Sequence, residues 1–209
     1  MPPAVITIGH SNHPLERFLA LLARHEVEAL VDIRRFPGSR KHPHFNKDNL
    51  AAALPKAGVD YHWFEALGGR RPKQRDESPN LGLANQGFRN YADYMLNEEF
   101  REAVAKLLEI ARPKQTAILC AEGLFWPCHQ RLVSDFLVAS GVTVQHLMPS
   151  GDLRPHTRMS GAVIESGRVA YPGERSLFTE AVDLPWATAL CIAAAEPRAK
   201  RFCSRRAKG

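Results

Sequence analysis

Short apolar runs alternate with amphipathic segments over residues 4–148 of the chain. The apolar runs, which we predict to be strands, cover residues 4–9, 27–34, 59–64, 116–122 and 142–148. Between them, apolar residues recur at helical spacing, as Leu15, Phe18, Leu19 and Leu22 do. Strands that alternate with helices are typical of α/β domains, so we predict a mainly parallel sheet with helices on both faces.

Capping and breaking residues predict where the helices begin and end. Pro14 marks the start of the first helix, and Asn46 and Gly58 are the predicted N-cap and stop of the second. Asn97 is the predicted N-cap of the helix that begins at residue 98. Pro127 lies in the first turn of a helix predicted over 128–140, and Gly141 is its stop. A polar loop from Glu65 to about Gln86 precedes a helix over 88–95. The pair Ser166-Gly167 predicts a small C-terminal β-hairpin.

These patterns divide the chain into three parts. We predict an α/β domain with the functional site over residues 1–150, an extension packed on it over 151–197, and a disordered basic tail over 198–209. The tail holds six of the 28 basic residues, and the remaining 22 equal the 22 acidic residues. The net charge of +6 therefore resides in the tail, which is either a solubilising terminus or a non-specific contact for phosphates.

The composition is that of a globular protein, with 44% hydrophobic and 24% charged residues. No segment has the pattern of a signal peptide or the length of a membrane span. The four cysteines do not form the pattern of a disulfide framework, so we expect a reducing, cytoplasmic location with free thiols. The sequence identifies no cofactor and no oligomeric state.

Ionisable and polar side chains follow the predicted strands. In a parallel sheet the carboxyl ends of the strands share one edge, where ligands bind, so we expect these residues to form one site. They are His10 and Ser11 after the first strand, Asp32, Arg34, Arg35, Ser39 and Arg40 after the second, Cys120, Glu122, Cys128, His129 and Arg131 around the fourth, and His146 in the fifth. Some of these charges could instead pair with one another in a purely structural role, for example Asp32 with Arg34.

Four kinds of chemistry could use this set. Cys120 or Cys128 could be a reactive thiol at a strand end or helix start, although the bulky loop between them differs from a rhodanese loop. The C-x7-C-H spacing of Cys120, Cys128 and His129 is not that of a zinc finger, so we predict no metal site, while a site completed by a distant histidine stays open. Glu122 and Asp32 could act as general acid and base with His10 and His129.

Phosphate binding is the fourth possibility. Arg34, Ser39 and Arg40 lie in a segment that also contains Phe36 and Phe45, and Arg70 follows a glycine pair in "LGGRR". Arginines interleaved with aromatic rings suit a phosphate backbone with stacked bases. Ser11 and Arg131 could add further contacts to the same group.

Several motifs together resemble the domain-of-unknown-function family 488. They are "TIGHS", "DIRRFPGSR", "LGG", "YADYM" and "CAEGLFWPCHQR", in this order from Thr7 to about His146. The resemblance implies an intracellular α/β fold whose site comprises the motif positions, and it points weakly to DNA repair. One position departs from the family pattern: Gln130 separates His129 from Arg131, where the family has arginine directly after the histidine.

Three functions are compatible with these observations. We expect an enzyme that acts on a phosphate-bearing substrate, nucleic acid or a nucleotide, in a processing or repair role. The alternatives are a thiol-dependent, rhodanese-like sulfur transferase and a nucleic-acid-binding protein without catalytic activity. The substrate and the reaction stay open at this stage.

Overall fold

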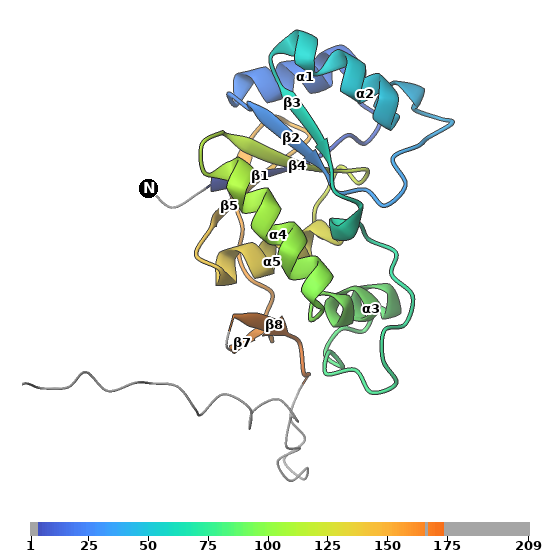
Figure 1. The fold of residues 1–209 in the computed structure, drawn as a ribbon, viewed down its shortest axis with the longest axis vertical. Helices are drawn as coiled ribbons and strands as arrows, with labels where there is room; N and C mark the ends of the chain where they lie inside the picture. The colour runs from blue at the N-terminus through green and yellow to red at the C-terminus, as the bar shows by residue number, and fades with distance from the viewer. Residues whose placement is uncertain (1–3, 166, 174–209) are drawn as a thin grey trace, which may run out of the picture. The chain divides into compact units, whose positions relative to one another are not determined.

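The fold is known from a computed structural model, which describes residues 4–165 and 167–173. Its central sheet contains β1 (Ala4–Gly9), β2 (Ala29–Asp32), β3 (Asp60–Trp63), β4 (Thr116–Cys120), β5 (Thr143–Leu147) and β6 (Leu153–Pro155), in the order β3-β2-β4-β1-β5-β6 (Figure 1). The first five strands are parallel, and β6 pairs antiparallel with β5. This confirms the predicted α/β class.

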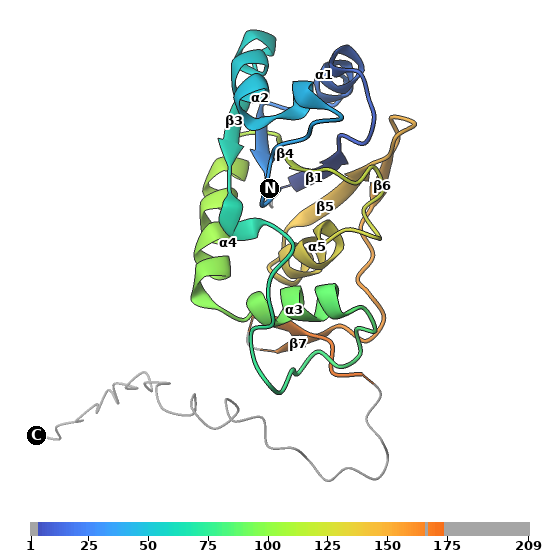
Figure 2. The ribbon, with the colours of Figure 1, turned by 90° about the vertical axis from the view of Figure 1, so that its right-hand side faces the viewer.

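Helices cover both faces of the sheet (Figure 2). On one face, α1 (Leu15–Arg24) and α2 (Lys47–Ala53) pack on side chains such as Ile6 and Leu119. On the other, α4 (Glu98–Ala111) and α5 (Gln130–Ala139) pack on side chains such as Val5 and Ile118. Successive residues of a strand point to opposite faces, which explains why the buried strands are apolar without interruption.

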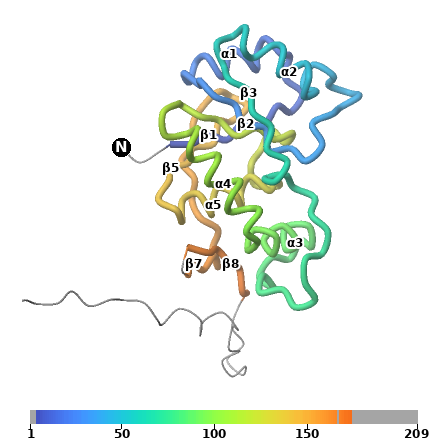
Figure 3. Tube along the Cα trace, in the orientation of Figure 1, coloured from blue at the N-terminus to red at the C-terminus, as the bar shows by residue number. Residues whose placement is uncertain are grey.

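The third helix and the hairpin lie beside each other at one end of the fold (Figure 3). Helix α3 spans Gln86–Tyr94, and β7 (Val163–Glu165) pairs with β8 (Arg168–Ala170) in the predicted hairpin. The loop before α3 is tied to the segment after β8, because Tyr171 N–H donates to Asn80 Oδ1 and Gly82 N–H donates to the Tyr171 carbonyl. The remaining helices are the short 3-10 turns Pro43–Phe45, Pro55–Ala57 and Glu65–Leu67.

The structure corrects several predicted boundaries. The helix predicted over 128–140 begins only at Gln130, so Pro127 lies in the preceding turn and not in the first helical turn. Asn46 precedes α2, but its side chain accepts a hydrogen bond from Ser39 N–H and does not cap the helix. Asn97 also makes no capping bond, whereas Asn85, which the pattern missed, caps α3 by accepting from Phe88 N–H.

Strand β6 was also not predicted; it begins the expected extension and joins the main sheet. The basic tail over 198–209 and the rest of residues 174–209 lie outside the described residues. None of the helices in the described part of the chain has the length and apolar character needed to cross a bilayer.

Candidate thiol site

A cleft of about 770 Å³ opens at the carboxyl ends of β1, β2 and β4. Ten of the fourteen residues predicted at the site line it: His10, Ser11, Arg34, Arg35, Ser39, Arg70, Cys120, Glu122, Cys128 and His129. The backbone turns after β1 and β4 lie close together, since His10 N–H donates to the Cys120 carbonyl and Ser11 N–H donates to the Ala121 carbonyl. A Cβ atom at Gly9 would lie 1.7 Å from the Glu122 carbonyl oxygen, so this approach requires glycine in "TIGHS".

Two cysteines and a histidine meet at the base of the cleft, and we call Cys120, Cys128 and His129 the thiol cluster. Both cysteines are buried. The Cys128 thiol donates to Cys120 Sγ across 3.2 Å, and His129 Nδ1 lies 3.5 Å from Cys128 Sγ and 3.9 Å from Cys120 Sγ. The sequence separates the cysteines by a loop, and the fold brings their sulfur atoms into contact.

The environment of Cys120 favours its thiolate. The hydrogen bond from the Cys128 thiol is the main cause that holds the pKa of Cys120 well below its usual range, and it outweighs the opposing effect of burial. The His129 ring and the backbone N–H of Glu122 act in the same direction. The pKa of Cys128 is raised well above its usual range. The main cause is its hydrogen bond to Cys120, and burial is the second cause. The two thiols therefore titrate as a pair, in which Cys120 is the first to lose its proton.

The orientation of His129 is fixed by its other nitrogen. His129 Nε2 lies 3.2 Å from the Ile33 carbonyl, which can only accept, so Nε2 carries a proton. Nδ1 is then the atom that exchanges a proton with the two sulfur atoms. Tyr91 packs edge-on against the ring at 5.0 Å, and a Cβ at Gly69 would lie 2.8 Å from Nδ1, so a glycine of "LGG" is needed here.

The thiol cluster is also the one group of donors in the described residues that could hold a metal ion, since its three donor atoms lie within 4.8 Å of one another. Two thiolates bound tetrahedrally to one zinc ion at about 2.3 Å would lie about 3.8 Å apart. The observed separation of 3.2 Å is shorter and fits a hydrogen-bonded thiol–thiolate pair better. The donor types suit zinc, but the geometry favours thiol chemistry.

Asp32 and Arg34 form a buried ion pair at the wall of the cleft. Arg34 Nε and Nη2 donate to the two carboxylate oxygens of Asp32 at 2.8 and 2.5 Å, and Tyr61 OH donates to the same carboxylate. Arg34 also donates to the Phe45 carbonyl. Asp32 is fully buried and does not line the cleft, so its oxygen atoms are committed to these partners. The small part of Arg34 that is not buried lines the cleft.

Arg35, which the sequence placed in the set of strand ends, has hydrogen-bonding capacity that Arg34 lacks. Arg35 Nη1 donates to the Arg70 carbonyl at 2.7 Å, while its buried Nε has no hydrogen-bond partner. Arg70 and Ser11 both have positive φ angles, 57° and 46°, and both line the cleft. Non-glycine residues rarely adopt this conformation, and it is often found at binding sites. Arg35 and Arg70 thus place two guanidinium groups at the cleft.

His10 and Glu122 complete the polar lining. Burial is the main cause that lowers the pKa of His10 to about 4, and the neighbouring Arg34 acts in the same direction. His10 Nδ1 lies 2.9 Å from the Ser11 carbonyl, so this nitrogen carries the proton and Nε2 is free to accept one. Glu122 is exposed at the mouth of the cleft. Both residues could therefore take part in proton transfer.

Four predicted residues do not line the cleft: Asp32, Arg40, Arg131 and His146. Arg40 is exposed, and Arg131 is half-buried on α5. Gln130 is buried and donates to the carbonyls of Ile8 and Ile118, so the position after the histidine faces the sheet and not the cleft.

His146 was expected at the site but belongs to a buried chain of hydrogen bonds, which we call the histidine network: Thr7, His146, His156, Asp135 and Tyr171. Thr7 Oγ1 contacts His146 Nδ1 at 2.7 Å, His146 Nε2 contacts His156 Nδ1 at 2.8 Å, and His156 Nε2 contacts Asp135 Oδ1 at 2.8 Å. Tyr171 OH donates to Asp135 Oδ2. Burial, followed by the charge of His156, lowers the pKa of His146 to about 3.

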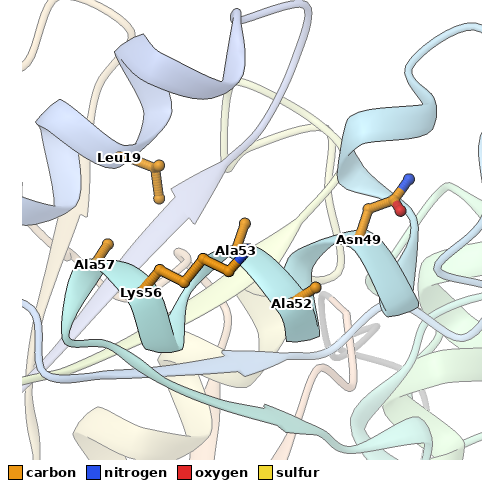
Figure 4. A pocket seen from close by; sticks show the side chains of 6 residues that line it. All are labelled: Leu19, Asn49, Ala52, Ala53, Lys56 and Ala57. Carbon is orange, nitrogen blue, oxygen red and sulfur yellow. The ribbon is translucent and has the colours of Figure 1, made fainter.

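A second, shallow hollow lies on α1, α2 and the turn after α2 (Figure 4). It is lined by Leu19, Asn49, Ala52, Ala53, Lys56 and Ala57. Lys56 is its one ionisable side chain, so this hollow has no group of residues that could carry out chemistry.

One protein family matches most of the part of the chain that forms the cleft. The family described as "Domain of unknown function DUF488" matches residues 14–137 of the 209. The chain belongs to this family. The match contains the thiol cluster and the segment from Asp32 to Arg70. The "TIGHS" motif lies before the matched residues, and β5 lies after them. No significant match was found among curated proteins or among solved structures.

The cleft includes residues that the strand-end rule did not find. His42, Asn85, Phe88 and Tyr91 also line the cleft. Apart from His42, they come from the start of α3, which follows a long loop and not a strand. The "YADYM" motif was the available signal, because it includes Tyr91 and resembles the family pattern.

Proposed function

We propose that this DUF488 protein is a thiol-dependent transferase in which Cys120 is the nucleophile. One observation carries the proposal: Cys120 Sγ, at the base of a cleft, accepts a hydrogen bond from the Cys128 thiol at 3.2 Å and faces His129. A thiolate held in this way at neutral pH is the reactive form of cysteine. A reducing cytoplasm, which we also propose as the location, would keep both thiols available.

Sulfur transfer is the reaction that best fits the neighbouring charges. The Cys120 thiolate would attack the outer sulfur of a sulfane donor such as thiosulfate, the sulfur–sulfur bond would break, and sulfite would leave with the bonding electron pair. The products are a Cys120 persulfide and sulfite. Arg35 and Arg70 would bind the anionic donor and its leaving group, since guanidinium groups match such oxyanions.

The test is the pH dependence of alkylation by iodoacetamide. Trypsin releases both cysteines in one peptide, residues 115–131, between Lys114 and Arg131, and fragment sequencing separates Cys120 from Cys128. We expect Cys120 to react at a pH well below the ordinary thiol range of about 8.5, and Cys128 to react later. Two thiols that both titrate in the ordinary range would overturn the proposal.

Metal analysis of the purified protein is the matched control for this experiment. The proposal expects full alkylation of Cys120 without release of zinc. A stoichiometric zinc ion, lost when Cys120 or Cys128 is replaced by serine, would instead assign the thiol cluster to metal binding and contradict the role of Cys120 as a free nucleophile.

A phosphate-bearing substrate is the second candidate, because Arg35 has an unpartnered Nε and Phe36 beside it is 67% exposed. An exposed ring next to arginines suits a stacked base with its phosphate. Oligonucleotide binding over a salt series, with full-length protein and with a chain ending at residue 197, tests this candidate. Binding that weakens after Arg35→Ala or Arg70→Ala supports it; absence of binding by both chains overturns it, and with it the nucleic-acid-processing role.

A further inference from the structure

Sulfur uptake by Cys120 uses Cys128 only as a hydrogen-bond donor, yet Cys128 is itself a thiol in contact with Cys120 Sγ. A thiol at this distance from a persulfide is itself a nucleophile directed at the inner sulfur atom. We propose that Cys128 resolves the Cys120 persulfide, so that the protein releases the sulfur as sulfide and stores the oxidation as a Cys120–Cys128 disulfide. This inference rests on the proposed function.

The geometry favours the inner sulfur. Cys128 Sγ lies 3.2 Å from Cys120 Sγ, and both side chains belong to the same buried pair, so the attacking and attacked atoms are already in contact. The cysteines are joined by a seven-residue segment that turns back on itself, with Cys128 N–H donating to the Phe125 carbonyl. The loop therefore presents the second thiol to the first without a rearrangement of the fold.

The resolving step forms one sulfur–sulfur bond and breaks another. Cys128 loses its proton and attacks Cys120 Sγ; a bond forms between the two cysteine sulfur atoms, the bond to the outer sulfur breaks, and this sulfur leaves with the electron pair. The outer sulfur is reduced to sulfide, and the two cysteines are oxidised to a disulfide. An external dithiol of the thioredoxin or dithiothreitol type must then reduce the disulfide to restore the enzyme.

His129 is placed to transfer the proton. Its Nδ1 lies 3.5 Å from Cys128 Sγ and 3.9 Å from Cys120 Sγ, while the proton on Nε2 is held by the Ile33 carbonyl. Nδ1 can therefore accept the Cys128 proton and donate it to the departing sulfur. This role predicts a raised pH optimum for sulfide release when His129 is replaced by asparagine, which keeps polarity but has no titratable ring.

Mass spectrometry of the non-reduced peptide 115–131 tests the inference. The wild-type chain is treated with thiosulfate without a reductant, and sulfide is measured in the same sample. We expect the wild-type peptide to become lighter by two hydrogen atoms, with one equivalent of sulfide released. The serine hydroxyl of Cys128→Ser can still donate to Cys120, so sulfur uptake should be slower but present. This peptide should become heavier by one sulfur atom, and the variant should release no sulfide. Cys191 and Cys203 lie outside this peptide and do not affect its mass.

The outcomes separate the two proposals. If neither the wild-type nor the Cys128→Ser peptide changes mass, sulfur uptake is absent and the proposed function fails with it. If the wild-type peptide keeps the added sulfur and releases no sulfide, uptake is real but Cys128 is not a resolving thiol. Native circular dichroism checks that Cys128→Ser folds, and sulfide release by the wild-type chain is a second measurement that does not depend on this variant. A wild-type disulfide that forms without thiosulfate in parallel samples would attribute the oxidation to air and contradict the inference.

Discussion

The thiol cluster and the histidine network are two groups of titratable side chains that differ in how completely their hydrogen bonds are satisfied. In the network, Asp135 accepts from His156, Tyr171 and the Met159 N–H, and one neutral form of each histidine satisfies every contact in the chain from Thr7. In the cluster, two sulfur atoms share one proton and one imidazole nitrogen beside a cleft.

This difference separates a structural role from a chemical one. A buried polar chain with every donor paired fixes one arrangement of the fold, here by holding the segment around His156 and Tyr171 on α5. A nucleophile that faces a cleft with a shared proton can react. Phe125 joins the two regions, because its ring stacks on His146 at 3.4 Å while its carbonyl accepts from Cys128 N–H.

Replacing Cys120, the proposed nucleophile, should have the largest effect. Cys120→Ser leaves Cys128 as the only thiol of the cluster, and Cys128 is buried. The rate at which peptide 115–131 is alkylated at pH 7 should therefore fall on the order of 100-fold or more. The free energy of unfolding should change by only about 1 kcal/mol. Unchanged alkylation would show that the cluster is not the reactive group.

Breaking the histidine network should lower the stability of the fold and leave the alkylation rate unchanged. Asp135→Ala leaves His156 and Tyr171 without their buried acceptor, and we expect a loss of about 3–5 kcal/mol in the free energy of unfolding. The isosteric Asp135→Asn keeps an acceptor and should lose less. Urea unfolding measures both variants. The folded fraction should alkylate at the wild-type rate, and a large drop in that rate would mean that the two regions are not separate.

Removing the imidazole of the cluster should give a smaller effect on the same thiol. His129→Ala raises the pKa of Cys120, because one of the groups that stabilise the thiolate is lost. A shift of one pH unit lowers the alkylation rate at acidic pH by about tenfold. Tyr171→Phe, which changes only the network, is the control and should leave the pH profile unshifted; equal shifts in both variants would contradict the assignment.

The smallest effect concerns acid stability. His10 and His146 have pKa values lowered to about 4 and about 3, below the ordinary value of 6.5. As pH falls below 6.5, the unfolded chain binds protons that the folded chain does not, so folding is destabilised by up to about 1.4 kcal/mol per pH unit for each group. Unfolding between pH 6.5 and 5 should show a shallower slope for His146→Gln than for wild type, and parallel slopes would refute this.

The pattern of the sequence was sufficient for the fold class and for most of the site. Uninterrupted apolar runs such as 116–120 must be buried on both faces, and this alone indicates a parallel sheet covered by helices. The rule that ligands meet the carboxyl ends of parallel strands then brought His10, Cys120 and His129 together. It failed for Asp32 and His146. The pairing of Asp32 with Arg34 was open as an alternative, but the contacts of Asp32 with Tyr61 and of His146 with His156 were not visible in the sequence.

The sequence by itself therefore determined the sheet, its two helical layers and the edge at which the polar side chains gather. Only the tertiary structure decided what these side chains do there. The proton shared by Cys120 and Cys128, the Nε2 contact of His129 to Ile33 and the free Nε of Arg35 all depend on distances of a few ångströms between segments that are far apart or turned back on themselves. Hydrogen bonding and desolvation act at that range, and sequence periodicity does not specify it.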